Sequence, residues 1–147
     1  MAFLDTSAPS EIRDVQIKVS GTSPNAYGIY IDEFSLQHSI RITSSTVDVG
    51  GASNNTGIHF RGLQLNVEQS QVRATGSNSI GILLYFGGTR LIEHSVVAGA
   101  SYTVLNQVST GAFIGASRLQ GGPSFGGATC AGVYDESFTF FAGPACP

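Results

Sequence analysis

The chain has 147 residues, 19 of them glycine, with 12% charged residues and a formal net charge of −3. Abundant Ile, Val, Leu and Phe exclude a disordered chain, and the scarcity of Lys, Glu and Gln beside many Gly and β-branched residues excludes a helical bundle. A mildly acidic chain without a basic run is not suited to nucleic acid. Without an apolar run of membrane length, we expect no membrane partner.

The first residues do not read as an export signal. Met1 to Asp5 lack the basic stretch and the apolar core of a secretory signal. Two locations therefore stay open: the cytoplasm, if this start codon is native, or the exterior, if the chain is a mature piece of an exported parent. We expect residues 1–11 to form a lead-in before the first repeat.

A short pattern recurs along the chain: an aliphatic residue, two others, Ser, one other residue and a second aliphatic residue. A degenerate first copy begins at Ile12, and the four full copies have serines 25, 25 and 22 residues apart: Ser45, Ser70, Ser95 and Ser117. A second marker follows each copy, at Gly28-Ile29, Gly57-Ile58, Gly81-Ile82, Thr103-Val104 and Gly132-Val133. Two markers that keep the same order indicate a true structural repeat.

The residues inside each copy alternate as in β-strands. Ile29 and Ile31, like Val47 and Val49, are separated by one residue, and clusters of Gly, Ser, Asn and Thr divide the short runs. Leucine-rich repeats need a Leu and Asn signature, and propeller blades need about 40 residues. The sequence therefore predicts an all-β, right-handed parallel β-helix of about five coils over residues 12–120, with three short strands in each coil.

The same register predicts how side chains stack from coil to coil. The four repeated serines should lie above one another at a corner, where each hydroxyl can hydrogen-bond the next coil. Lys18, Asp48 and Arg73 should stack on the outside as a weak charge row. Frequent bends account for the abundant glycine, because tight bends need positive φ.

The C-terminal stretch, residues 121–147, departs from the repeat. A glycine-rich loop at residues 121–127 is followed by strand-like sequence that contains four aromatic residues: Tyr134, Phe138, Phe140 and Phe141. The open end of a solenoid needs an atypical terminal repeat. We therefore expect this segment to cap the last coil with its aromatic side chains.

The run from Cys130 through Val133, Tyr134, Asp135, Glu136 and Phe138 to Cys146-Pro147 resembles the C-terminal segment of bacterial right-handed β-helix repeat proteins of the pectate-lyase-like superfamily. The resemblance is specific over residues 130–147 and follows only the pattern over residues 12–120. It implies an exported, non-catalytic module, and it favours a disulfide between Cys130 and Cys146. The spacing alone leaves open two free thiols, the usual state in the cytosol.

Some parallel β-helices cleave polysaccharides, so an active site has to be considered. The acidic pairs Asp32-Glu33 and Asp135-Glu136 should lie about four coils, roughly 19 Å, apart, whereas the carboxyl groups of glycosidases lie within about 5–9.5 Å. We therefore predict no catalytic residues. Asp32, Arg61 and Tyr85, which follow the second marker in successive coils, form the best candidate ligand face.

Other motifs in the sequence give weaker evidence for a functional site. Residues 122–126 match Gly-x-Ser-x-Gly, but no strand and helix flank them as a nucleophile elbow requires. The three histidines, His38, His59 and His94, fall in different coils and are expected to be surface or turn residues, with His59 pointing outward. We expect no metal and no cofactor.

Aromatic residues also gather near the second marker: Tyr27, Tyr30, Tyr85, Phe86 and Tyr102. Such a row could be a sugar platform or a subunit interface.

The sequence favours a non-catalytic structural or adhesive β-helix module of a bacterial surface or secreted protein, which self-associates as a trimer or dimer through this aromatic face. The alternative is a carbohydrate-binding or polysaccharide-cleaving β-helix, a lyase or glycoside hydrolase, with glycan on the Asp32, Arg61 and Tyr85 face.

Overall fold

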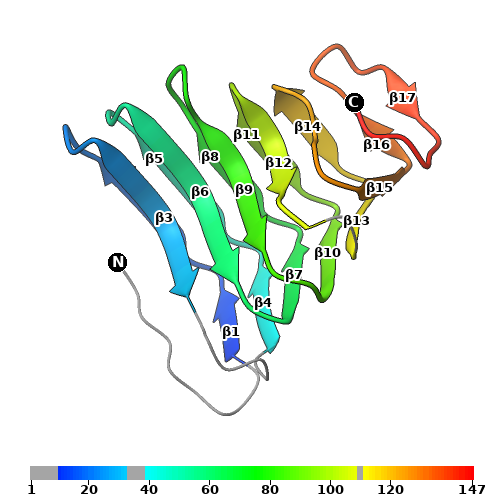
Figure 1. Ribbon diagram of the computed structural model, residues 1–147, viewed down its shortest axis with the longest axis horizontal. Coiled ribbons are helices and arrows are strands. Elements are labelled where there is room, and N and C mark those ends of the chain that lie inside the picture. Colours follow the sequence, from blue (N-terminus) through cyan, green and yellow to red (C-terminus); the bar gives the residue numbers. More distant parts are fainter. Residues whose placement is uncertain (1–9, 33–38, 109–110) are drawn as a thin grey trace.

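The computed structural model describes residues 10–32, 39–108 and 111–147. All regular secondary structure in these residues is β-strand, and the strands form three sheets of a parallel β-solenoid (Figure 1). The predicted all-β parallel β-helix is therefore confirmed. The first strand begins at Ser10, inside the expected lead-in.

Each coil up to β12 contributes one strand to each of three sheets in turn. Sheet A contains β1 (Ser10–Arg13), β4 (Ser39–Thr43), β7 (Gln64–Glu68), β10 (Thr89–Glu93), β13 (Ala112–Gly115) and β15 (Ala128–Ala131). Sheet B contains β2 (Gln16–Ser20), β5 (Thr46–Gly50), β8 (Gln71–Ala74), β11 (Val96–Gly99), β14 (Arg118–Gly121), β16 (Val133–Tyr134) and β17 (Phe140–Phe141). Sheet C contains β3 (Asn25–Asp32), β6 (Asn54–Arg61), β9 (Ile80–Tyr85) and β12 (Tyr102–Asn106).

The solenoid has about four full turns rather than the predicted five. Sheet C ends at β12 because the glycine-rich stretch after β14 crosses that side with a single bridge, between Leu105 and Phe125. The proposed fifth marker was also wrong. Gly132-Val133 lies at the turn between sheets A and B, where Val133 begins β16, and not in sheet C.

Inward side chains stack in rows that run along the solenoid. In sheet A one row is aliphatic up to the last coil, and it consists of Ile12, Ile42, Val67, Ile92, Ile114 and Cys130. Sheets B and C contribute parallel rows, such as Ile17, Val47, Val72, Val97 and Leu119. Each fully buried aliphatic side chain contributes about 1.5–3 kcal/mol, so these rows supply the main stabilisation of the fold.

The turn from sheet A to sheet B has the same conformation in every coil. One residue adopts the left-handed conformation, with φ between 43° and 65°, and the six equivalent residues are Asp14, Ser44, Gln69, His94, Ala116 and Gly132. Five of them carry side chains, although the left-handed conformation usually favours glycine. The neighbouring coils must therefore stabilise this turn.

The predicted serine ladder provides that stabilisation. Ser45, Ser70, Ser95 and Ser117 directly follow the left-handed residues and are at most 5% exposed. The backbone N–H groups of Ser45, Ser70 and Ser95 each donate to the hydroxyl of the serine in the next coil, at 3.1 Å. Every ladder hydroxyl also donates to the carbonyl two residues before it, at 2.7–2.8 Å. The ladder is confirmed, and Val15 and Val133 occupy its two end positions.

Glycine occupies the second marker in sheet C because a side chain there would clash with sheet B, and not because the chain bends there. A Cβ atom at Gly57 would lie 2.4 Å from the side chain of Val72, and one at Gly81 would lie 2.6 Å from that of Val97. The strand of sheet C approaches sheet B too closely at this point for any side chain. The expectation that glycine marks bends is therefore incomplete.

The C-terminal segment closes the solenoid, but its aromatic side chains do not plug the core. β15 extends sheet A, and β17 pairs antiparallel with β16, which interrupts the parallel order of sheet B (Figure 1). Phe140 is 56% exposed because it lies on the outer side of β17, and Phe138 is 65% exposed because it lies in the turn between β16 and β17, with a left-handed φ of 62°. Cys130 is buried at this end of the core. A disulfide joins it to Cys146, which packs against the core.

Replacing a ladder serine should destabilise the protein. In Ser70→Ala the N–H of Ser45 loses its acceptor in a buried turn, and we expect a loss of about 1–3 kcal/mol in the free energy of unfolding. Urea titration followed by circular dichroism measures this. Ser53→Ala, at an exposed position, is the control and should change little; an equal effect of both changes would contradict a stabilising ladder.

Removing the disulfide should also destabilise the C-terminal end. A bridge between residues separated by 16 positions stabilises a protein by about 3 kcal/mol through loop closure, and we expect the Cys130→Ser and Cys146→Ser double variant to melt about 6–12 °C lower. Differential scanning calorimetry without reductant compares the two proteins. Equal melting temperatures would show that the bridge does not stabilise the folded state.

Candidate functional site

The outer face of sheet C brings the predicted ligand residues into one row. Asp32, Arg61 and Tyr85 are in register on β3, β6 and β9. Arg61 Nη1 lies 2.9 Å from Asp32 Oδ1, and its guanidinium carbon lies 5.9 Å from the ring centre of Tyr85 and 5.1 Å from that of Phe86. The sequence thus placed these three residues correctly relative to one another, and the first two form an ion pair.

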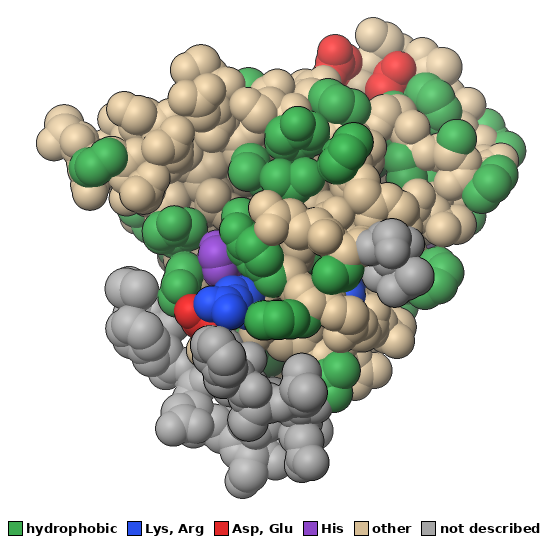
Figure 2. Space-filling view, viewed as in Figure 1, with side chains coloured by type: hydrophobic (Ala, Val, Ile, Leu, Met, Phe, Trp, Pro, Cys, Tyr) green, Lys and Arg blue, Asp and Glu red, His purple; other side chains and the backbone are tan. Residues whose placement is uncertain are grey.

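Aromatic rings stack beside this row. The ring centres of Tyr30 and His59 are 4.5 Å apart with the planes inclined by 27°, and His59 and Tyr85 follow at 5.0 Å. The coil spacing of about 4.8 Å matches the distance at which rings stack. Because stacked rings cover one another's faces, this cluster offers a ligand mainly ring edges. Figure 2 shows hydrophobic side chains gathered over this face, with a histidine beside one basic and one acidic group.

His59 lies on the outer side of sheet C, as predicted, but it is not a surface residue. It is only 7% exposed, because Tyr27, Tyr30 and Tyr85 enclose its ring. Neither ring nitrogen has a hydrogen-bond partner, and Tyr27 meets the imidazole edge-on, at an interplanar angle of 89°. Burial lowers the pKa of His59, outweighing the opposing attraction of Asp32.

A hydrogen bond adds to the polar end of this cluster. The Tyr30 hydroxyl donates to Asp32 Oδ2 at 2.9 Å, and this bond is the main reason why the pKa of Tyr30 is raised. The Asp32 carboxylate therefore accepts from both Arg61 and Tyr30.

A buried arginine holds the loop beside the site. Arg90 is fully buried on β10, in a core row between Leu65 and Ala112. Its guanidinium donates to four backbone carbonyls, those of Gly62, Tyr85, Phe86 and Gly88, and burial lowers its pKa. Phe86 in this loop has a left-handed backbone with φ of 62° and is 40% exposed.

The role of Arg90 was missed from the sequence. Arg90 occupies an inward strand position that is Ser10 in the first coil and an aliphatic residue or Ala in the others, and it comes shortly after Gly87-Gly88. A basic residue at a core position of a repeat could have indicated a buried contact with backbone carbonyls, because a buried arginine needs hydrogen-bond acceptors for most of its donors.

A cavity of about 380 Å³ lies against the cluster and is lined by Tyr30, His59, Arg61, Tyr85, Phe86, Gln107 and Val108. Its walls are mostly aromatic and apolar, with the Gln107 amide and the Arg61 guanidinium as its polar groups. Such a cavity suits a neutral molecule of limited size or an apolar side chain from another protein. It holds no pair of free carboxylates for hydrolysis.

The remaining sequence candidates do not join this site. Asp135 accepts hydrogen bonds from the N–H groups of Ser137 and Thr139 and organises the C-terminal turn. The Ser124 hydroxyl contacts Thr103 Oγ1 at 2.9 Å in the glycine-rich loop, without a neighbouring helix. His94 occupies the A-to-B turn as expected. Glu33 and His38 lie outside the described residues.

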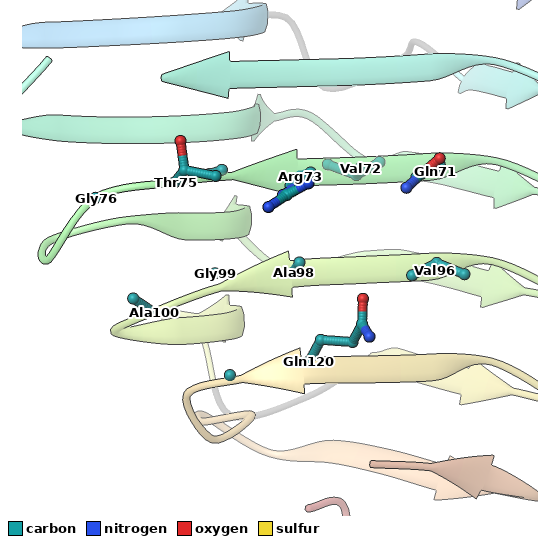
Figure 3. A pocket seen from close by; sticks show the side chains of 12 residues that line it. Gln71, Val72, Arg73, Thr75, Gly76, Val96, Ala98, Gly99, Ala100 and Gln120 are labelled. Atoms are coloured by element: carbon teal, nitrogen blue, oxygen red, sulfur yellow. The ribbon is translucent and has the colours of Figure 1, made fainter. Parts of the chain in front are cut away.

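A second hollow, of about 560 Å³, lies on the outer face of sheet B (Figure 3). Lys18, Asp48, Arg73, Ala98 and Gln120 form one row in the predicted register. The last three of them line the hollow. Figure 3 shows the short Ala98 side chain between Arg73 and Gln120, which leaves the hollow open. The charges stack as expected, although the salt bridges found among the described residues join Arg41 with Glu68, Arg13 with Glu11 and Arg61 with Asp32.

Within the described residues, no group of three or more His, Cys, Asp or Glu side chains could hold a metal ion. The same part of the chain contains no helix with the length and apolar character of a membrane span.

Comparisons of the chain with protein-family models, with curated proteins and with solved structures found no match.

The buried imidazole should make stability depend on pH. Because the pKa of His59 is lower in the folded protein than its ordinary value of about 6.5, the unfolded chain binds the proton first as the pH falls. Stability is therefore lost below about pH 6.5, until the folded-state pKa is passed. We expect the melting temperature of the wild type to fall more steeply between about pH 7.5 and pH 5.5 than that of His59→Phe.

The control for this comparison is His94→Asn, which removes an exposed histidine and keeps a residue that tolerates the left-handed turn. It should retain the pH dependence of the wild type. If His59→Phe also retained it, the buried imidazole would not be the source.

Proposed function

We propose that this chain is a non-catalytic structural or adhesive β-solenoid module of a bacterial surface or secreted protein, and that it self-associates. The observation that carries the proposal is the continuous ladder of buried serines, which connects consecutive coils at one corner. A solenoid stabilised by repeated contacts between neighbouring coils is a stiff support. Its outer faces are then available for contact rather than for chemistry.

The closed C-terminal end supports an exported location. The disulfide between Cys130 and Cys146 joins a buried core residue of β15 to the end of the chain. Disulfides persist in oxidising surroundings such as the periplasm and the cell exterior. This bond is consistent with the surface or secreted setting in the proposal.

Carbohydrate binding or cleavage is a second candidate, and one observation favours it. Asp32, Arg61 and Tyr85 lie in one row beside a cavity of about 380 Å³ that contains aromatic walls and an amide. A sugar could contact the edge of Tyr85 and hydrogen-bond Gln107. The stacking of the tyrosine and histidine rings counts against a flat sugar platform.

Two measurements separate these functions. Light scattering behind size exclusion gives the mass of the native protein, and a glycan array with reducing-end assays on pectin and alginate detects binding and cleavage. We expect a mass of two or three chains, no release of reducing ends and no glycan retained. Glycan binding that is lost in Tyr85→Ala, but kept in Tyr134→Ala on the other side of the protein, would overturn the structural proposal in favour of the second candidate.

A further inference from the structure

The outer face of sheet C contains one continuous row of aromatic and aliphatic side chains beside the Asp32–Arg61 ion pair. In register across the coils, one row of this face contains Tyr30, His59, Leu83 and Leu105, and the bridge to Phe125 continues it. The corresponding rows of the other sheets are polar: Arg13, Thr43, Glu68 and Glu93 in sheet A, and Lys18, Asp48, Arg73, Ala98 and Gln120 in sheet B. His59 and Leu83 in this row are only 7% exposed, whereas Phe86 and Phe125 beside it are 40% and 62% exposed. Exposed apolar side chains that border a row of this kind indicate a contact.

The charges on this face are balanced within the chain. Arg61 and Asp32 form an ion pair at 2.9 Å, and Tyr30 donates to the same carboxylate. The main electrostatic cost of an interface is the burial of unpaired charge. Covering this face buries no unpaired charge among the described residues. Lys18 and Arg73 on sheet B carry charges without such a salt bridge in the described structure.

This charge balance favours a second copy of the same chain over other occupants. Two copies of a neutral face meet without like-charge repulsion, and an isologous contact pairs each apolar row with itself. A lipid surface is disfavoured because the chain has a net charge of −3 and the arginine beside this row, Arg61, is already paired. A glycan would meet ring edges rather than ring faces.

We propose that the outer face of sheet C packs against the same face of a second copy of this chain, and that the contact requires His59 to be uncharged. The proposal rests on the self-association proposed above and names the surface that performs it. Phe125, at 62% exposure, and Phe86, at 40%, would supply apolar side chains at the two ends of the contact. The cavity beside His59 would receive an apolar side chain of the partner copy.

The requirement for an uncharged His59 follows from its surroundings. The groups that face it are Tyr27, Tyr30 and Asp32 on β3, Arg61 on β6 and Tyr85 on β9. Its ring nitrogens already lack partners, and a second copy would exclude water further. Association should lower the pKa of His59 beyond the shift in the single chain. By linkage, association then weakens as the pH falls through this pKa.

The experiment is light scattering over a concentration series at about pH 7.5 and about pH 5.5. The wild type should be a dimer, or a higher oligomer that uses this face, at the higher pH. Its dissociation constant should be several-fold higher at the lower pH, because the single chain takes up the His59 proton more readily than the oligomer. Two matched pairs of variants locate the surface. Phe125→Asp and Leu105→Lys on sheet C should give monomers, whereas Phe113→Asp and Leu91→Lys on sheet A should keep the wild-type mass.

Circular dichroism of each variant shows that the coil is intact, and the pH series on the wild type needs no substitution. A protein that is monomeric at every concentration overturns both this inference and the proposed self-association. An oligomer that Phe125→Asp and Leu105→Lys leave unchanged overturns only the choice of face. A dissociation constant that does not change with pH, or that changes equally in His59→Phe, overturns the role of His59.

Discussion

Each coil of this protein passes from sheet A to sheet B through one left-handed residue, and the serine that follows attaches this turn to the next coil. The left-handed residue bends the chain from sheet A into sheet B within the turn. It also directs the following N–H away from its own coil, where only the hydroxyl of the next serine accepts it. An unpaired buried N–H would cost about 1–3 kcal/mol, so the rest of the stacking depends on this repeated bond.

The ladder also fixes the register of the core rows. If one coil shifted by a residue, its serine would leave the ladder and its inward aliphatic side chains would face water. The glycines of sheet C then become necessary, because the register brings Gly57 and Gly81 against the side chains of Val72 and Val97. At the C-terminal end, where the ladder position is Val133, an antiparallel pair and a disulfide replace it.

The same register also decides which side chains stack on the outer faces, and these side chains differ between sheets B and C. On sheet B it produces rows of polar side chains around a hollow at Ala98. On sheet C it stacks Tyr30, His59 and Tyr85 at the spacing of aromatic rings and pairs Asp32 with Arg61. Arg90, inside the coil, holds the loop that carries Phe86 beside this cluster. A scaffold built for stacking thus presents one neutral, aromatic face, and we regard that face as the functional surface.

The repeat of serines and glycine markers was enough to predict the parallel β-helix, the ladder and the row of Asp32, Arg61 and Tyr85, because side chains one period apart must stack. Sequence spacing says nothing, however, of contacts between different rows. Only the tertiary structure decided that the rings beside His59 bury it and that Arg90 points inward to backbone carbonyls. It likewise decided that Phe138 and Phe140 face solvent, and that the glycine-rich loop ends sheet C after about four turns. These features depend on the packing of residues that are distant in the sequence, whereas the period itself is a local property of the chain.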